Sequence, residues 1–265
     1  MENEIPETPL PPPESQIETQ PQFAPRTEVH KPVAPAWHTI LIVIIVLYLS
    51  YLSSKQAGGP GLGSHGRISL YTATILQNCA LLGIVWFGLW LKKVRLRDLI
   101  GGTWKPVDLV LDVLVAASFW LVSLIILVTI RLGLGTVRFD QKASADAVKT
   151  VSGILPHSTH ELPGFILVAL MAGFFEEILF RGYLQKQLSA FTGSAYAGLI
   201  ISGALFGAAH GYQGVRMMVV LAIYGMMFGL LAHFRKNLRP GMMAHAWQDS
   251  IAGITFLILT KYKLI

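Results

Sequence analysis

The amino-acid sequence predicts an all-α protein: a polytopic bundle of about seven transmembrane helices behind a disordered, Pro-rich N-terminal tail. Hydrophobic residues make up 53% of the chain and charged residues only 14%, whereas about a quarter of the residues in soluble proteins are charged. The apolar residues are also gathered into runs, most of them near the roughly 20 residues that a membrane-spanning helix needs. The expected spans are 36–52, 70–91, 109–130, 164–184, 195–209, 215–234 and 242–259.

The segment before the first span has a different composition. Residues 1–35 interleave prolines with glutamates and polar residues, and such a stretch buries too little apolar area to offset its ordering entropy. We therefore expect a disordered tail over 1–35, three helices over 36–131, a connecting loop over 132–161 and a C-terminal helical core over 162–260. Cys79, the single cysteine, forms no disulfide within the chain and is expected to be a small buried residue.

Most of the positive charge lies at the ends of the apolar runs, which favours a topology signal over nucleic-acid binding. Two clusters follow the second and sixth expected spans, so they fall on the same side of the membrane, and the positive-inside pattern makes that side the cytoplasmic one. The clusters are Lys92, Lys93, Arg95, Arg97 and Arg235, Lys236, Arg239. The N-terminus is then cytoplasmic as well. The fifth span, 195–209, is short and rich in Gly and Ala, which favours close helix packing.

Two adjacent carboxylates interrupt the fourth span. Glu176 and Glu177 lie in an otherwise apolar run, and ionisable groups at such depth are costly unless they are paired or functional. Arg181 follows Glu177 by four residues, the favourable order for a helical ion pair. Helix geometry separates the two glutamates by about 100°, so we expect them to face different partners. An ion-paired packing motif is the alternative to a functional role for this pair.

Two later spans carry polar groups at the same spacing. Phe206 and His210 share one helix face, as do His245 and Asp249. Taken singly, His210 fits a satisfied core histidine and His245 with Asp249 fits a hydrogen-bonded pair. Together with Glu176 they supply a base, an imidazole that shares its proton and further polar groups near a developing oxyanion, which is the inventory for activating water.

These residues meet only under particular geometric conditions. A turn near Thr192 and Gly193 would bring Glu176 and His210 level in an antiparallel hairpin. His245 lies only a few residues after the turn at 236–240, so the fourth and fifth helices must extend beyond their apolar parts around 185–194.

The three motifs together resemble those of the CPBP family, which comprises type II CAAX prenyl endopeptidases and bacteriocin-processing or self-immunity proteins. The motifs are Phe175-Glu176-Glu177-x-x-x-Arg181, Phe206-x-x-x-His210 and His245-x-x-x-Asp249. The resemblance implies an intramembrane endopeptidase whose catalytic core lies within 162–260.

In the roles that the resemblance implies, Glu176 activates water with the help of His210, and His245 and Asp249 stabilise the oxyanion. Glu177, Arg181 and Phe206 support the site. Eukaryotic members carry Asn at the place of Asp249, and an ionised carboxylate would repel an oxyanion. Asp249 is therefore protonated, or orients His245, or leaves the oxyanion to His245 alone.

The expected substrate is a membrane-associated, lipidated or hydrophobic peptide or protein, with the lipid bilayer as surroundings, no nucleic acid, and a bacterial plasma membrane as the location. No cofactor is expected. Two His and two carboxylates could bind Zn²⁺, but the adjacent glutamates do not form the His-Glu-x-x-His pattern of zinc proteases. A non-proteolytic membrane scaffold, a bacteriocin-immunity protein and a proton-coupled transporter are the alternative functions.

Overall fold

The computed structural model describes residues 31–56, 63–133 and 152–264, and within these ranges the chain is helical, with no strand. The predicted all-α class is confirmed. The helices are α1 (Ala36–Gln56), α2 (Ser64–Leu91), α3 (Leu96–Ile100), α4 (Pro106–Gly133), α6 (Leu162–Glu176), the π-helix η1 (Glu177–Leu184), α7 (Gln185–Thr192), α8 (Ala195–Ala209), the 3₁₀ turn η2 (Gly211–Gln213), α9 (Val215–Arg235) and α10 (Arg239–Lys261).

Every expected span lies within one of these helical segments. Among the described residues, five helices are long and apolar enough to cross a membrane, namely those over 36–55, 65–91, 106–130, 162–192 and 215–235. The helix α8 is apolar but shorter. The helix α10 carries Arg239, His245 and Asp249 and is not one of the five, although its length of 23 residues would suffice.

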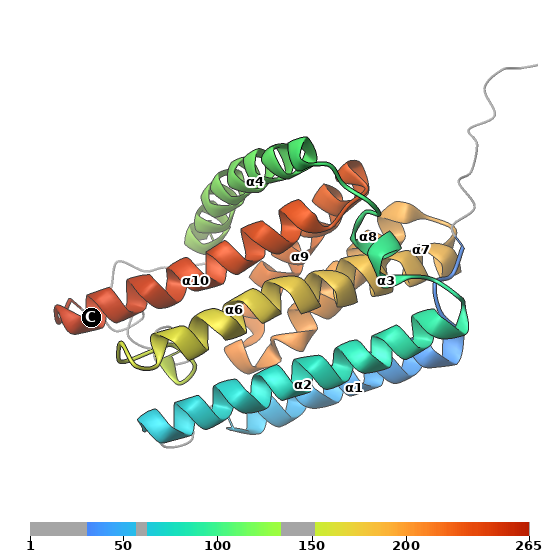
Figure 1. Ribbon diagram of the computed structural model, residues 1–265. Helices are drawn as coiled ribbons and strands as arrows, with labels where there is room; N and C mark the ends of the chain where they lie inside the picture. Colours follow the sequence, from blue (N-terminus) through green and yellow to red (C-terminus); the bar gives the residue numbers. More distant parts are fainter. Residues whose placement is uncertain (1–30, 57–62, 134–151, 265) are drawn as a thin grey trace, which may run out of the picture.

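The helices pack in successive layers (Figure 1). The helix α2 packs on one side of α6, and α1 lies beside α2 and packs on α8 and η2. The helix α10 covers another side of α6 and carries α4 on its outer face. The Gly- and Ala-rich α8 packs most extensively on α9, as its composition predicted. A Cβ atom at Gly207 would lie 2.8 Å from Ala222 Cβ and 2.9 Å from Ala222 N, so glycine is required at this helix contact.

The fourth span is longer than its apolar run. The segments α6, η1 and α7 form one continuous helix of 31 residues from Leu162 to Thr192, because the backbone stays right-handed through both junctions. It ends at Gly193, which has φ 68°, a conformation that glycine adopts without strain. Ser194 then caps α8 through its side chain. The turn near Thr192 is confirmed, and so is the extension of the fourth helix, which continues to Thr192. The fifth helix does not extend as expected, because α8 begins at Ala195, where its apolar run begins.

The boundary of the predicted tail needs correction. Residues 1–30 lie outside the described part of the chain, but Val33 and Ala34 are buried, with both backbone amides bound to Gln187 Oε1. Residues 31–35 therefore belong to the packed structure. The expectation for Cys79 is also wrong, because its side chain is exposed on the outer face of α2. Much of the expected loop 132–161 lies outside the described residues, and its end is held by a bidentate Arg67–Glu161 pair at 2.7 and 2.9 Å.

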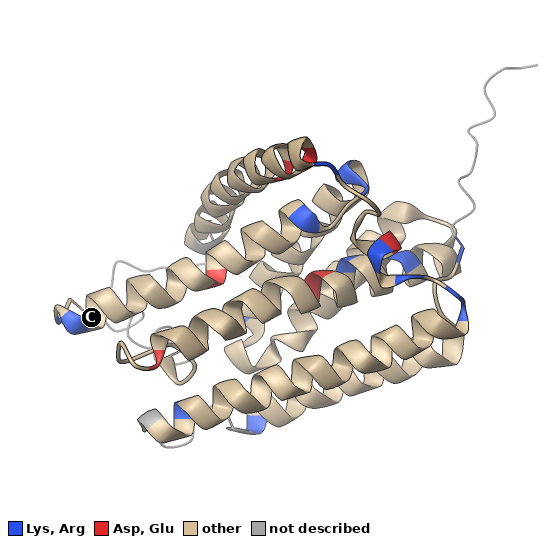
Figure 2. Ribbon diagram, viewed as in Figure 1, with Lys and Arg blue, Asp and Glu red and all other residues tan. Residues whose placement is uncertain are grey.

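Lys and Arg residues are most numerous at the end of the bundle that contains α3 and α7, with fewer at the opposite end (Figure 2). The turn between α9 and α10 meets α3 there, since Leu238 N donates to Ile100 O at 2.9 Å. Asp112, fully buried in α4, accepts hydrogen bonds from Arg235, Asn237 and Arg239. The two positive clusters therefore lie at the same end, as the sequence predicted.

Candidate active site

The predicted ion pair between Glu177 and Arg181 is present in the core. Arg181 Nη1 lies 3.1 Å from Glu177 Oε1, and each side chain is 1% exposed. The guanidinium also donates to Gly225 O at 3.2 Å and lies 4.4 Å from the ring centre of Phe206 and 5.0 Å from that of Phe228. Cation–π contacts of this kind are stronger away from water. Arg181 is thus held by one carboxylate, one carbonyl and aromatic faces.

His245 joins the two glutamates to the last helix. Its Nδ1 lies 3.2 Å from Glu177 Oε1, and its Nε2 lies 3.8 Å from Glu176 Oε2 and 3.7 Å from Asp249 Oδ2. The expectation that adjacent glutamates must face different partners is wrong, because the two ring nitrogens on opposite sides of one imidazole reach both carboxylates. The helix also changes from α to π at Glu177, and such π segments occur frequently at functional sites.

The meeting of α6 and α10 depends on two glycines. A Cβ atom at Gly173 would lie 2.7 Å from Ala246 N and 2.8 Å from Met242 O, so the two helix backbones touch one turn before the glutamates. At Gly241, a Cβ atom would lie 3.1 Å from Glu177 Oε2. These small residues let the helices approach closely, which places His245 beside both carboxylates.

Phe206 brings His210 to the same cluster. Its ring centre lies 4.7 Å from His210 and 6.1 Å from His245. His210 follows the end of α8, and its Nδ1 lies 2.8 Å from Phe206 O. Because a carbonyl only accepts, Nδ1 carries the proton and Nε2 of the neutral ring is left as an acceptor. The described contacts include no direct hydrogen bond between His210 and Glu176.

Glu176 differs from its neighbour in its surroundings. Its side chain is 21% exposed, against 1% for Glu177. Its Oε2 atom is buried and accepts no hydrogen bond from the described residues. Glu177 therefore pairs with Arg181 and His245, whereas Glu176 has a carboxylate oxygen that accepts no hydrogen bond from the described residues.

Two tyrosines near the cluster were not predicted. The hydroxyl of Tyr224, 4% exposed, has no hydrogen-bond partner among the described atoms, and its ring lies 4.7 Å from Phe228. Desolvation raises the pKa of Tyr212 to about 12, and the charges of Glu176 and Asp249 add to this shift. Tyr212 therefore stays a neutral phenol at physiological pH. No motif marks either residue. Tyr212 lies three residues after the end of the expected span 195–209, and Tyr224 is a buried residue within α9.

The donor groups of the described site can be compared with the ligand set of a zinc site. Among the described residues, no three His, Cys, Asp or Glu side chains are grouped so that they could hold a metal ion. Both nitrogens of His245 face carboxylates instead of a shared central position.

The site thus places buried carboxylates and imidazoles among helices that are long and apolar enough to cross a membrane. Residues 158–251 match the family model described as type II CAAX prenyl endopeptidase Rce1-like. The match contains all seven residues of the predicted site and confirms that this segment resembles the family. No curated protein and no solved structure matches the chain.

Proposed function

We propose that this protein is an endopeptidase of the glutamate type that hydrolyses a peptide bond of a lipidated or hydrophobic, membrane-associated peptide. One observation carries the proposal: Glu176 Oε2 is buried without a hydrogen-bond donor and lies 3.8 Å from His245 Nε2. A carboxylate with a free lone pair inside a membrane protein is a functional candidate, and general-base catalysis requires such a group.

In the proposed reaction, Glu176 takes a proton from water while the oxygen attacks the scissile carbonyl carbon. The carbonyl π electrons move to oxygen and form a tetrahedral oxyanion. The proton then passes to the leaving nitrogen, the carbon–nitrogen bond breaks, and a carboxylic acid and an amine are released. His210 shares the proton, because its Nε2 is the free acceptor of a ring fixed through Nδ1.

His245 is the proposed oxyanion partner. Glu177 accepts from Nδ1 at 3.2 Å, which fixes the ring and directs Nε2 toward the space between Glu176 and Asp249. A donor aimed at the developing charge is among the strongest contributions to acyl-transfer catalysis. Asp249 then stabilises the protonated imidazole of His245. The negative charge of Asp249 is favourable in this role, whereas in direct contact with the oxyanion it would be repulsive. Arg181 and Phe206 hold Glu177 and the two imidazoles in place.

The proposal includes no metal or other cofactor. Exhaustive chelation followed by reconstitution in metal-free buffer should leave the cleavage rate unchanged within about twofold. Loss of cleavage that added Zn²⁺ restores would contradict the metal-free mechanism while leaving the protease assignment intact.

Cleavage of a quenched peptide library, including C-terminally prenylated CAAX peptides, tests the function directly. Wild-type protein and the Glu176→Ala and His210→Ala variants are compared in the same proteoliposomes. We expect cleavage by the wild type and a loss of at least about 100-fold in each variant. Absence of cleavage by the wild type in every lipid mixture would favour a scaffold or bacteriocin-immunity role, and equal cleavage by Glu176→Ala would refute the mechanism.

We further propose that the basic end of the bundle faces the cytoplasm of a bacterial cell, which places the N-terminus there too. The support is the shared position of the two positive clusters and the positive-inside pattern. Accessibility of cysteines introduced at Lys93 and at Lys263, measured with an impermeant thiol reagent in a Cys79→Ser background, checks the orientation. Labelling of Lys93→Cys from outside intact cells would contradict it.

A further inference from the structure

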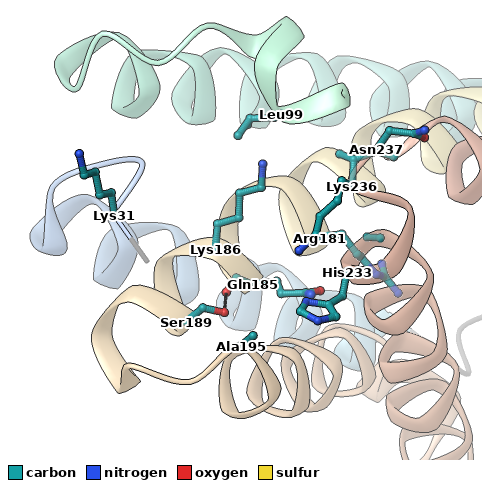
Figure 3. A pocket seen from close by; sticks show the side chains of 12 residues that line it. Lys31, Leu99, Arg181, Gln185, Lys186, Ser189, Ala195, His233, Lys236 and Asn237 are labelled. Carbon is teal, nitrogen blue, oxygen red and sulfur yellow. Dashed lines mark hydrogen bonds between the residues drawn. The ribbon is translucent and has the colours of Figure 1, made fainter. Parts of the chain in front are cut away.

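A cavity lies at the basic end of the bundle, and Glu176 is not among its lining residues. It has a volume of about 540 Å³ and is formed by the η1–α7 helix, the start of α8, the turn between α9 and α10, and Lys31 (Figure 3). Its basic lining groups are Lys31, Lys186, His233 and Lys236, together with Arg181, whose charge is already paired with Glu177. No Asp or Glu is among its described lining residues, so the cavity is suited to an anion.

The nearest exposed carboxylate does not cancel this charge. Asp98 in α3 is bound by Arg95 through two hydrogen bonds, at 2.8 and 3.2 Å. The Arg95 guanidinium lowers the pKa of Asp98, so Asp98 is ionised and already paired at neutral pH. Lys186 and Lys236 are both exposed at the cavity rim.

Gln185 supplies a second, independent sign of a ligand. Its side chain lines the cavity and is 7% exposed. Its Nε2 donates to Gly229 O at 3.1 Å, whereas its Oε1 has no partner among the described atoms. A buried acceptor without a donor carries a desolvation cost. Gln185 Oε1 is closed to solvent in this structure, so a ligand hydroxyl satisfies it once the side chain turns toward the cavity.

We propose that this cavity binds the headgroup of an anionic phospholipid that carries both a phosphate and a hydroxyl, as phosphatidylglycerol does. The lysines contact the phosphate, and Gln185 Oε1 accepts from the headgroup hydroxyl. The place in the fold favours a lipid, because basic pockets between helices at a membrane surface are typical headgroup sites. This binding goes beyond the proposed proteolysis and does not depend on it.

The test measures binding of a fluorescent phosphatidylglycerol to the full-length protein in neutral detergent. The Lys186→Gln/Lys236→Gln variant removes two rim charges. Lys92→Gln/Lys93→Gln is its matched control: it removes two exposed lysines at the same end but outside the cavity. The two variants are also matched in backbone strain, because each replaces one lysine with a left-handed backbone: φ is 57° at Lys93 and 54° at Lys236. We expect affinity to fall about 30-fold in the cavity variant and by no more than about threefold in the control.

A second comparison tests the hydroxyl contact. Phosphatidylmethanol has the same charge but no hydroxyl, so the wild type should prefer phosphatidylglycerol about fivefold. Gln185→Met removes the acceptor and should abolish that preference while both lipids still bind.

Three results would overturn the assignment. Equal losses in the cavity variant and its control would mean attraction by diffuse surface charge. Displacement by inorganic phosphate as effective as by unlabelled phosphatidylglycerol would mean a free-phosphate site. Displacement by a hydrophobic peptide with a free C-terminal carboxylate, but not by its amide, would mean a substrate subsite.

Discussion

Replacing Glu177 with alanine is expected to destabilise the fold strongly. Its partner Arg181 is 2% exposed, and the substitution leaves a buried guanidinium without its carboxylate at 3.1 Å. Breaking a buried ion pair from one side costs about 3–5 kcal/mol. The rings of Phe206 and Phe228 still lie 4.4 and 5.0 Å from the guanidinium, but cation–π contacts stabilise by only about 0.5–2 kcal/mol. The substitution also removes the acceptor of His245 Nδ1. We therefore expect a loss of about 3–5 kcal/mol.

Equilibrium unfolding in mixed detergent micelles measures this loss. Glu176→Ala is the matched control in the adjacent position, and because Glu176 Oε2 accepts no hydrogen bond, its cost should stay within about 1 kcal/mol. In a double variant, Arg181→Met removes the orphaned charge and should recover part of the stability, since apolar replacement of a buried pair is often nearly neutral.

Two results would refute the reasoning. A cost below about 1 kcal/mol for Glu177→Ala would mean that Arg181 does not depend on this carboxylate. A double variant less stable than Glu177→Ala alone would mean that Arg181 contributes mainly through contacts other than the ion pair.

Three further changes probe how the helices are held. Gly173→Ala places a Cβ atom 2.7 Å from a backbone nitrogen of α10 and should lower the free energy of unfolding by about 1–3 kcal/mol. Gly83→Ala is the control, because its Cβ atom would have nothing within 4 Å and should not destabilise the fold. Equal effects of the two substitutions would contradict the close contact. Gln187→Ala removes the acceptor of two backbone amides and should speed hydrogen exchange at residues 33–34, and unchanged exchange would show that the contact is dispensable. Asp112→Ala removes the partner of Arg235 and Arg239 and should increase proteolysis of the α9–α10 turn, whereas an unchanged cleavage pattern would argue against this anchor.

Local sequence spacing predicted the contacts made within one helix. Arg181 could be paired with Glu177 because four residues bring side chains onto one helix face, and the Gly- and Ala-rich composition of 195–209 predicted close packing. The turn at Gly193 followed from its residue type. The order of helices and the position of most spans followed from apolar run length alone.

Contacts between distant helices could not be predicted in the same way. His245 reaches Glu177 across 68 residues, and this depends on how closely Gly173 lets α10 approach α6. Spacing in an ideal α-helix placed the two glutamates on different faces and therefore predicted different partners for them. The π segment and the imidazole that reaches both carboxylates depend on tertiary packing, which residue spacing does not describe. The packing of Val33 and Ala34 on Gln187 was hidden by the Pro-rich composition around them.

The most direct test of the central claim compares peptide cleavage by wild-type protein and by Glu176→Gln, a variant of nearly the same shape. The account predicts that the cleavage rate falls by at least about 100-fold, while the free energy of unfolding changes by less than about 1 kcal/mol. Glu176→Gln protein that is folded and cleaves at the wild-type rate would contradict the assignment of Glu176 as the base that activates water.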